Sequence, residues 1–149
     1  AAGAASASVL GSAWGSLRVS APREQLLLVE LNRPEKRNAL GAAFWREMVE
    51  CFEAIARDSS TRAVVITGAG NTFTAGIDLG DLAREFLAVE AEDAARRAWQ
   101  LRRKIEEFQE TFSVLEKCPK PVIAAVNGAC VGGGEGDRDS GAGGGSGGP

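Results

Sequence analysis

The chain contains no histidine and no tyrosine among its 149 residues. The missing imidazole excludes Ser-His-Asp and Cys-His nucleophile systems, as well as most zinc sites, which rely on a histidine ligand. The missing phenol removes another group that exchanges protons in active sites. Any acid-base chemistry in this sequence therefore falls to carboxylates, lysine or backbone amides.

Cysteines, basic clusters and long apolar runs are also sparse. Cys51, Cys118 and Cys130 are far apart and lie among apolar residues, which predicts buried free thiols in a reducing compartment. The net charge is -3 and the basic residues are dispersed, which argues against a nucleic-acid-binding surface. No apolar run approaches the roughly 18 to 20 residues of a membrane span. We therefore expect a soluble domain whose partners include neither nucleic acid nor a bilayer.

Three segments of the chain differ in composition. Residues 1–23 are rich in Ala, Ser and Gly and are predicted to be disordered, either as the remnant of an organellar transit peptide or as a plain flexible terminus. Residues 24–134 have the composition of a folded domain. Residues 135–149 are rich in Gly and Ser and bury little apolar surface, so they are also predicted to be disordered.

The middle segment alternates strand patterns with helix patterns. Short apolar runs predict three strands, at residues 24–31, 62–68 and 121–126. Apolar residues at helical spacing predict an amphipathic helix over 40–58 and a long helix over 91–118 that stops before Pro119. Strands separated by helices imply crossover connections, so this order predicts an α/β fold with a parallel sheet.

The loops after the second and third predicted strands are rich in glycine, and ligands of α/β sheets bind at such loops. The first loop reads "GAGNTFTAGIDLGDL", whose glycines suit a sharp turn or a close approach to a ligand. It lacks the Gly-Lys-Ser/Thr of a P-loop, and Phe73 replaces the third glycine of a dinucleotide fingerprint. The second loop contains Gly128 and the triplet 132–134.

Three linked motifs, "LNRPEKRNAL", "FTAGIDL" and "KPVIAAVNGACVGGG", have an order and spacing that resemble the enoyl-CoA hydratase/isomerase (crotonase) superfamily. The resemblance covers residues 24–134 and implies an α/β fold of repeated β-β-α units with a parallel sheet, of which this chain holds the N-terminal half only. The stretches "FWREMVECFEAIARD" and "ETFSVLEKCPKPVIAAV" are most similar to members that convert 3,5-dienoyl-CoA to 2,4-dienoyl-CoA during β-oxidation in mitochondria and peroxisomes.

The resemblance also implies a mechanism and a set of site residues. Two backbone N–H groups, from Ile77 and Gly133, would stabilise the enolate that forms on the thioester oxygen when a proton is removed. The thioester pocket implied by the family motif consists of Ala75, Gly76, Ile77, Asp78, Leu79 and Gly134. No metal or separate cofactor is implied, because CoA is part of the acyl-CoA thioester substrate.

Two of these assignments have structural alternatives. Lys36 and Arg37 follow the first strand and are candidates for binding CoA phosphates, but exposed Lys-Arg pairs are common in solvated turns. Asp78 is also well placed to cap the helix that follows it.

The sequence departs from the family pattern directly after the glycine triplet. The isomerases carry a carboxylate two residues after the third glycine, whereas this chain has Gly136 there, flanked by Glu135 and Asp137. The residues beyond it lack the apolar periodicity of a helix, so we expect a truncated chain that has the oxyanion loops but not the catalytic carboxylates. Two alternatives remain: an enoyl-CoA hydratase of the same family, or a non-catalytic fragment that binds acyl-CoA or joins the trimers and hexamers that the family forms.

Overall fold

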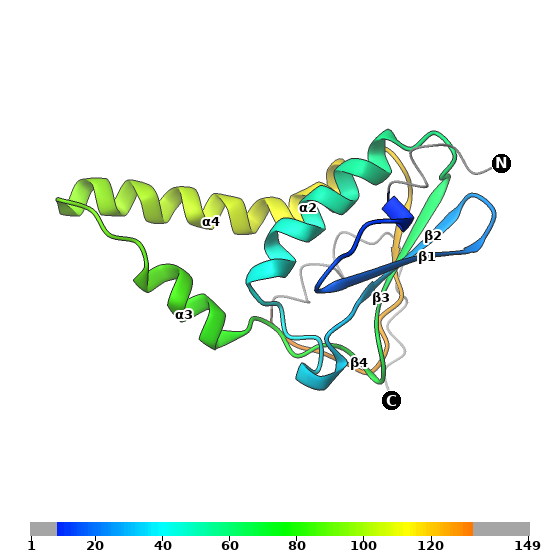
Figure 1. The fold of residues 1–149 in the computed structure, drawn as a ribbon, viewed down its shortest axis with the longest axis horizontal. Coiled ribbons are helices and arrows are strands. Elements are labelled where there is room, and N and C mark those ends of the chain that lie inside the picture. The colour runs from blue at the N-terminus through cyan, green and yellow to red at the C-terminus, as the bar shows by residue number, and fades with distance from the viewer. Residues whose placement is uncertain (1–8, 133–149) are drawn as a thin grey trace, which may run out of the picture.

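The computed structural model describes residues 9–132. These residues form a sheet with one helix lying against it, and two further helices extend away from the sheet (Figure 1). The main sheet has the strand order β1-β2-β3-β5. Its strands are β1 (Leu17–Arg23), β2 (Leu26–Leu31), β3 (Ala63–Gly68) and β5 (Val122–Ala124). Strands β2, β3 and β5 run parallel, whereas β1 is antiparallel to β2. The α/β prediction is confirmed, and the sheet is mixed rather than wholly parallel.

A second, two-stranded sheet lies beyond the ends of β3 and β5. It pairs β4 (Thr72–Thr74) in parallel with β6 (Ala129–Cys130). The helical elements are the 3-10 turn η1 (Pro34–Lys36), α2 (Ala42–Arg57), α3 (Leu79–Leu87) and α4 (Ala94–Lys117). The three predicted strands and the two predicted helices are all present, within a few residues of the expected bounds.

The core forms between α2 and one face of the main sheet. Along β2 and β3 every second residue is buried, as expected for strands with one covered face. Apolar residues of α2 at helical spacing meet that face, and Trp45 stacks on Phe108 of α4 with 4.7 Å between the ring centroids. The buried members of this cluster include Leu27, Val29, Phe44, Met48, Phe52, Ile55, Val64 and Ile66. The amphipathic pattern of α2 therefore orients the helix on the sheet.

The prediction that residues 1–23 are disordered is wrong for residues 9–23. Val9 is buried, and β1 pairs with β2 from Leu17 opposite Leu31 onward. The buried carboxylate of Glu47 on α2 accepts hydrogen bonds from the amides of Gly15 and Ser16 at 2.8 Å each, and from the Ser16 hydroxyl at 2.6 Å. Tertiary contacts therefore order a segment whose composition alone predicts disorder.

The C-terminal end of α2 is held by side chains from two directions. Lys120 donates hydrogen bonds to the carbonyl oxygens of Ile55 and Asp58, where a cation complements the helix dipole. The Asp58 carboxylate accepts hydrogen bonds from Ser60 and Thr61. Burial alone would raise the pKa of Asp58, but these hydrogen bonds and the Lys120 charge outweigh it and hold the pKa below its ordinary value.

Two further expectations concern membrane-spanning helices and the C-terminal segment. Within residues 9–132, none of the helices is both long and apolar enough to cross a bilayer. The segment 135–149, predicted to be disordered, lies outside the described residues.

The thiols are predicted to differ in reactivity. Burial, reinforced by the nearby Glu47 charge, raises the pKa of Cys51 to about 12, whereas Cys118 and Cys130 are half-buried. Because the thiolate is the nucleophile, Cys51 should resist iodoacetamide at pH 8 in the folded chain while the other two are alkylated. Peptide mass spectrometry would measure this, with guanidinium-unfolded protein as the control in which all three react. Comparable alkylation of Cys51 in the native chain would contradict the burial.

Candidate active site

The two glycine-rich loops identified in the sequence lie against each other in space. Asn127, after β5, donates hydrogen bonds from its side-chain nitrogen to the carbonyls of Gly68 and Gly70 at 2.8 and 3.0 Å. Its side-chain oxygen accepts from the Gly68 amide at 3.0 Å. Farther along, the Val131 amide donates to the Thr74 carbonyl at 3.1 Å. The loops are therefore joined along their length.

Gly76 is the point of closest approach between the loops. Its φ is +89°, and a Cβ atom there would lie 2.8 Å from the Val131 carbonyl oxygen and 3.8 Å from the Cα of Gly132. Only glycine fits both the backbone conformation and the space. The structure therefore brings Gly76 and Ile77 beside Gly132, the first glycine of the triplet. Gly133 and Gly134 lie outside the described residues.

The backbone around Ile77 is fixed by an isolated parallel bridge to Leu40. The Leu40 amide donates to the Gly76 carbonyl at 2.8 Å, and the Asp78 amide donates to the Leu40 carbonyl at 3.0 Å. This ladder uses the residues on both sides of Ile77 but leaves its own N–H unused, because alternate residues of a strand point their hydrogen-bonding groups in opposite directions. Within residues 9–132, the Ile77 amide donates no hydrogen bond.

Asp78 adopts the capping position anticipated as one of its two possible roles. Its carboxylate accepts hydrogen bonds from the Gly80 and Asp81 amides at 3.1 and 3.3 Å, at the N-terminus of α3. The same carboxylate forms an ion pair with Arg33 at 3.4 Å, and Arg33 also donates to the Ala39 carbonyl at 3.0 Å. Asp78 is thus committed to holding the loop in place.

Asp81 extends this support from α3 to α2. Its carboxylate accepts a hydrogen bond from the Ala42 amide, at the N-terminus of α2, at 2.9 Å. That bond is the main reason why the pKa of Asp81 is below its ordinary value, and the neighbouring Arg84 lowers it further. The two acids therefore tie together the starts of both helices that flank the Ile77 loop.

The remaining predicted residues occupy the surface of the same region. Leu79 is 76% exposed, and Ala75 is half-buried with its amide donating to the Arg37 carbonyl at 2.9 Å. Lys36 and Arg37 are both exposed, and neither side chain forms an ion pair with another residue in the described part of the chain. Arg37 has a φ of +50°, in the left-handed region, at the end of η1. The geometry is compatible with either interpretation of this basic pair.

Sequence reasoning missed the residue that connects these loops, Asn38. Its side chain is 2% exposed and donates hydrogen bonds to the carbonyls of Ala69 and Thr72 at 2.9 and 2.7 Å, while its side-chain oxygen accepts from the Arg33 amide at 2.9 Å. Its φ of +54° suits asparagine better than most residues. The only sequence signal is an asparagine next to a predicted turn, which is common.

Thr74 was also missed and joins three segments. Its hydroxyl donates to the Asn38 carbonyl at 2.6 Å and accepts from the Gly76 amide at 3.1 Å. Its carbonyl accepts from Val131 of the second loop. No group of three or more histidine, cysteine or acidic side chains suited to a metal ion exists among residues 9–132.

Paired glycine loops at the ends of parallel strands, with an unused amide between them, define an α/β protein of the crotonase type. The chain is similar to the crystal structure of an enoyl-CoA hydratase from Bacillus anthracis, with a TM-score of 0.69 and 30% identity over 85% of this chain and 45% of that one. A model of the enoyl-CoA hydratase/isomerase family matches residues 22–136. The chain belongs to the enoyl-CoA hydratase/isomerase family.

Two curated relatives carry a more specific name. The mitochondrial Δ(3,5)-Δ(2,4)-dienoyl-CoA isomerase of Homo sapiens is 59% identical over 121 residues, which are 81% of this chain and 37% of that protein. The peroxisomal enzyme of the same name from Arabidopsis thaliana is 38% identical over 105 residues, which are 70% of this chain and 38% of that protein. The chain thus spans a little over a third of the length of these relatives.

The Gly76 geometry predicts a loss of stability on substitution. Gly76→Ala places a methyl group against the Val131 carbonyl in a backbone conformation that alanine disfavours, and should lower the free energy of unfolding by about 1–3 kcal/mol. Gly80→Ala is the matched control, since its Cβ would be no closer than 3.4 Å to its nearest neighbour, and should change stability by less than about 1 kcal/mol. Urea denaturation would measure both, and equal effects would refute the close approach.

The Asn38 network predicts a larger loss. Asn38→Ala leaves the Arg33 amide and the Ala69 and Thr72 carbonyls without their partner, at about 1–3 kcal/mol for each group left buried and unsatisfied. Asn71→Ala removes an exposed side chain from the loop that Asn38 contacts and should be neutral within about 0.5 kcal/mol. If thermal unfolding shows that the two variants lose similar stability, Asn38 does not connect the loops as described.

Proposed function

We propose that this chain supplies the thioester-binding loops of a dienoyl-CoA isomerase, which moves the double bonds of 3,5-dienoyl-CoA to the 2,4 positions during fatty-acid β-oxidation. The observation that carries the proposal is the Ile77 amide, which the Leu40 bridge fixes in place without using its N–H. The dienoyl-CoA isomerase names of relatives at 59% and 38% identity support the choice of reaction. The same names place the activity in mitochondria or peroxisomes.

The proposed chemistry depends on negative charge at the thioester oxygen. Removal of a proton from the acyl chain leaves an enolate, and two backbone donors, Ile77 N–H and Gly133 N–H, stabilise it. One such donor is worth about 2.7–4 kcal/mol of barrier in enzymes that use an oxyanion hole. The close approach of Gly76 to Gly132 supports this proposal, because each of these glycines directly precedes one of the two proposed donors.

The neighbouring residues have supporting roles in this proposal. Gly76 and Gly134 allow the thioester to approach the backbone, and Ala75 and the exposed Leu79 offer apolar surface to the acyl chain. Lys36 and Arg37 provide cations for the CoA phosphates. Asp78 holds the loop rather than contacting the thioester, because its carboxylate is already occupied by the α3 cap and Arg33.

Proton transfer needs a carboxylate that the described residues do not provide. Asp78 is the acidic residue adjacent to Ile77, and its hydrogen bonds and ion pair hold its carboxylate in one position. Glu135 and Asp137 lie outside the described residues. We therefore propose that this chain binds and polarises acyl-CoA but has no isomerase turnover of its own.

An enoyl-CoA hydratase is the second candidate within the family. The similarity to the Bacillus anthracis enoyl-CoA hydratase supports it, and both reactions pass through an enolate that the same two amides would stabilise. The site geometry in residues 9–132 is common to the two candidates, so the choice between them follows the higher identity to the isomerases.

The proposal predicts that binding polarises the thioester. A 2,4-dienoyl-CoA bound to the wild-type chain should show a red-shifted absorption band, and Ile77→Pro should abolish the shift by removing the N–H. The substitution removes no hydrogen bond of the ladder, because Leu40 bonds to Gly76 and Asp78, and Ile77→Val is the control that retains the amide. An unchanged shift in Ile77→Pro, or no binding by the wild-type chain, would overturn the proposal.

The same preparation tests turnover. Addition of 3,5-dienoyl-CoA should give no rise in the absorbance of the conjugated product above the buffer blank. A rise that Glu135→Gln abolishes would show that this glutamate acts as the base and that the chain is catalytically competent.

A further inference from the structure

Two cavities adjoin at the end of the main sheet opposite to the candidate active site. One, of about 540 Å³, lies between the β1–β2 turn and the loop from α2 to β3. The other, of about 520 Å³, lies between that loop and the turn after α4. Ser59, Thr61 and Arg62 line both of them. Because β3 begins here and ends at a glycine-rich loop, about 20 Å of strand separates these cavities from the candidate active site.

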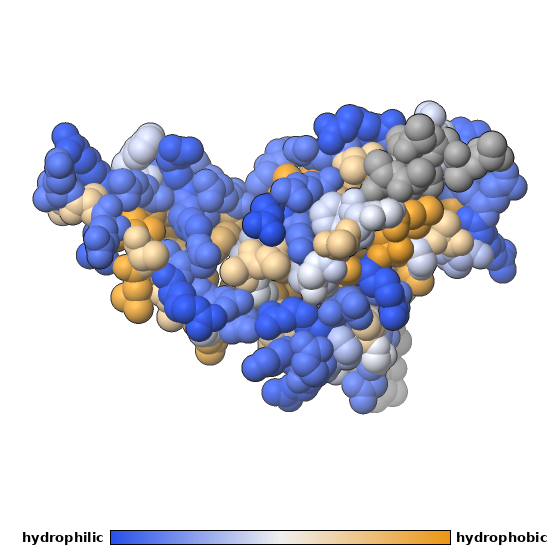
Figure 2. All heavy atoms as spheres, in the orientation of Figure 1, coloured by the Kyte–Doolittle hydropathy of each residue, from blue (hydrophilic) through white to orange (hydrophobic). Residues whose placement is uncertain are grey.

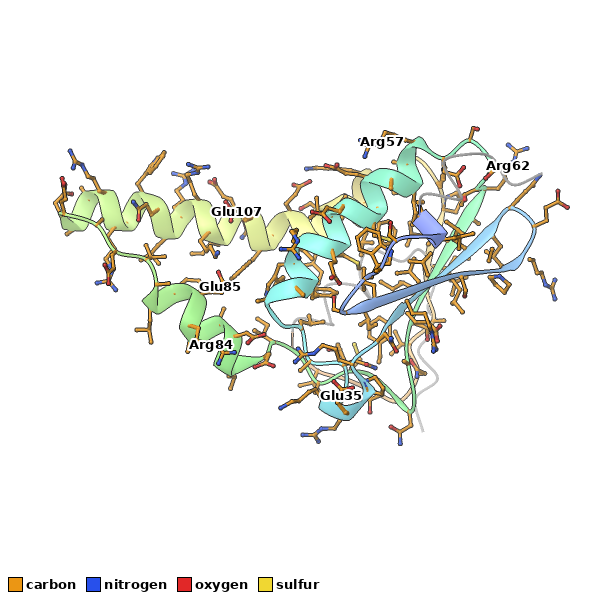
Figure 3. All side chains as sticks on the ribbon, viewed as in Figure 1. Glu35, Arg57, Arg62, Arg84, Glu85 and Glu107 are labelled. Carbon is orange, nitrogen blue, oxygen red and sulfur yellow. The ribbon has the colours of Figure 1, made fainter. Side chains whose placement is uncertain are left out.

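Basic side chains predominate over acidic ones in the lining of the two cavities. The cations are Arg23, Arg57, Arg62 and Lys120, and the acids are Glu24 and Asp58. Figure 3 shows Arg57 and Arg62 at the same end of the molecule. Hydrophilic residues predominate along the right-hand edge of the molecule, where the β1–β2 turn lies (Figure 2). The chain as a whole has a net charge of -3, so this basic end has the opposite sign.

Two of the four cations have no acidic partner. Arg23 and Arg62 are exposed, and neither forms an ion pair with another residue of the described chain. Arg57, by contrast, pairs with Glu53 at 3.7 Å. The Lys120 ammonium is occupied by carbonyl oxygens at the end of α2. The guanidinium groups of Arg23 and Arg62 are therefore available to an anion from solution.

The acids of this region do not neutralise that pair. Asp58 is 1% exposed, and its carboxylate already accepts hydrogen bonds from Ser60 and Thr61. Glu24 is exposed and has no ion pair between residues 9 and 132. The Ser59 hydroxyl, which lines both cavities, has no hydrogen-bond partner in that part of the chain. It is therefore a further donor that an anion could use.

The sheet fixes the spacing of the two unpaired arginines. Arg23, the last residue of β1, lies opposite Leu26 of β2. Leu26 in turn lies opposite Ala63, the residue that follows Arg62. The Arg62 amide is held by a hydrogen bond to the Gln25 carbonyl at 2.8 Å. Neighbouring strands are about 4.8 Å apart, so the backbones of Arg23 and Arg62 are about 10 Å apart across β2. Both cations are thus rooted in ordered backbone on either side of one cavity.

We propose that this end of the sheet binds a small anion with two linked phosphate groups, held between Arg23 and Arg62 with Ser59 as a third donor. A guanidinium group donates two parallel hydrogen bonds to a phosphate, so each arginine takes one of the two phosphates. A cavity of about 540 Å³ is within the usual size of a small-molecule site. The site is separate from Lys36 and Arg37, which the proposed function assigns to CoA.

Two sources share this chemistry, free inorganic diphosphate and the diphosphate of a nucleotide. They differ in what else they contact, because Leu10 and Leu26 also line the cavity and offer apolar surface to a nucleotide base. The two sources are therefore distinguished by their relative affinity.

Isothermal titration calorimetry with inorganic diphosphate in low salt tests the proposal. We expect one site per chain. Arg23→Gln and Arg62→Gln should each raise the dissociation constant by about 10-fold or more, because each removes charge-assisted hydrogen bonds. Arg62→Lys keeps the charge but loses the two-pronged geometry, so it should also weaken binding. Arg97→Gln is the matched control, since Arg97 is exposed on α4 and has no ion pair within residues 9–132, and it should bind as the wild-type chain does.

Further arms locate the anion and identify its source. Lys36→Gln/Arg37→Gln should leave diphosphate binding unchanged, and a loss there would place the anion at the candidate active site and refute the proposal. Tighter binding of adenosine diphosphate than of diphosphate supports a nucleotide ligand, and equal or weaker binding supports free diphosphate. Diphosphate should also raise the Tm of the wild-type chain but not that of folded Arg62→Gln. No binding by the wild-type chain, or binding that neither Arg23→Gln nor Arg62→Gln weakens, would overturn the proposal.

Discussion

The buried carboxamide of Asn38 is the interaction on which the candidate active site depends. It binds the loop after β2 to two carbonyls of the loop after β3, and the backbone carbonyl of Asn38 accepts a hydrogen bond from the hydroxyl of Thr74. These hydrogen bonds also position Leu40, two residues later, where it forms the bridge to Ile77. The position of the Ile77 amide thus follows from a polar side chain that is distant from it in the sequence.

Much of the fold could be predicted from the sequence because its main elements have strong local patterns. The apolar runs of β2 and β3 each predict a strand. The apolar stripe of α2 and the length of the α4 pattern each predict a helix, and all of these signals come from residues close together in the sequence. The glycine-rich loops could also be located, since they follow predicted strands, and Asp78 was recognised as a possible cap. These features depend on neighbours within a few residues, which is the information that a single sequence contains most directly.

The parts that were missed depend on contacts between distant segments. β1 contains alternating polar and small residues and becomes a strand because β2 offers it an edge and Glu47 fixes the preceding turn. β4 and β6 are only three and two residues long, so neither has a period to detect. Asn38 and Thr74 bond to residues more than 30 positions away. Their roles became visible only when the loops were placed together in space.

Glu47 limits how far a precursor of this domain can be trimmed from its N-terminus. The carboxylate is 6% exposed and depends on Gly15 and Ser16 for three hydrogen bonds. Proteolytic removal of a leader that ended beyond Ser16 would leave the Glu47 carboxylate without these donors, at a cost of about 1.5–3 kcal/mol for each hydrogen bond lost. A processing protease must therefore cut before Gly15 if the matured protein is to remain folded.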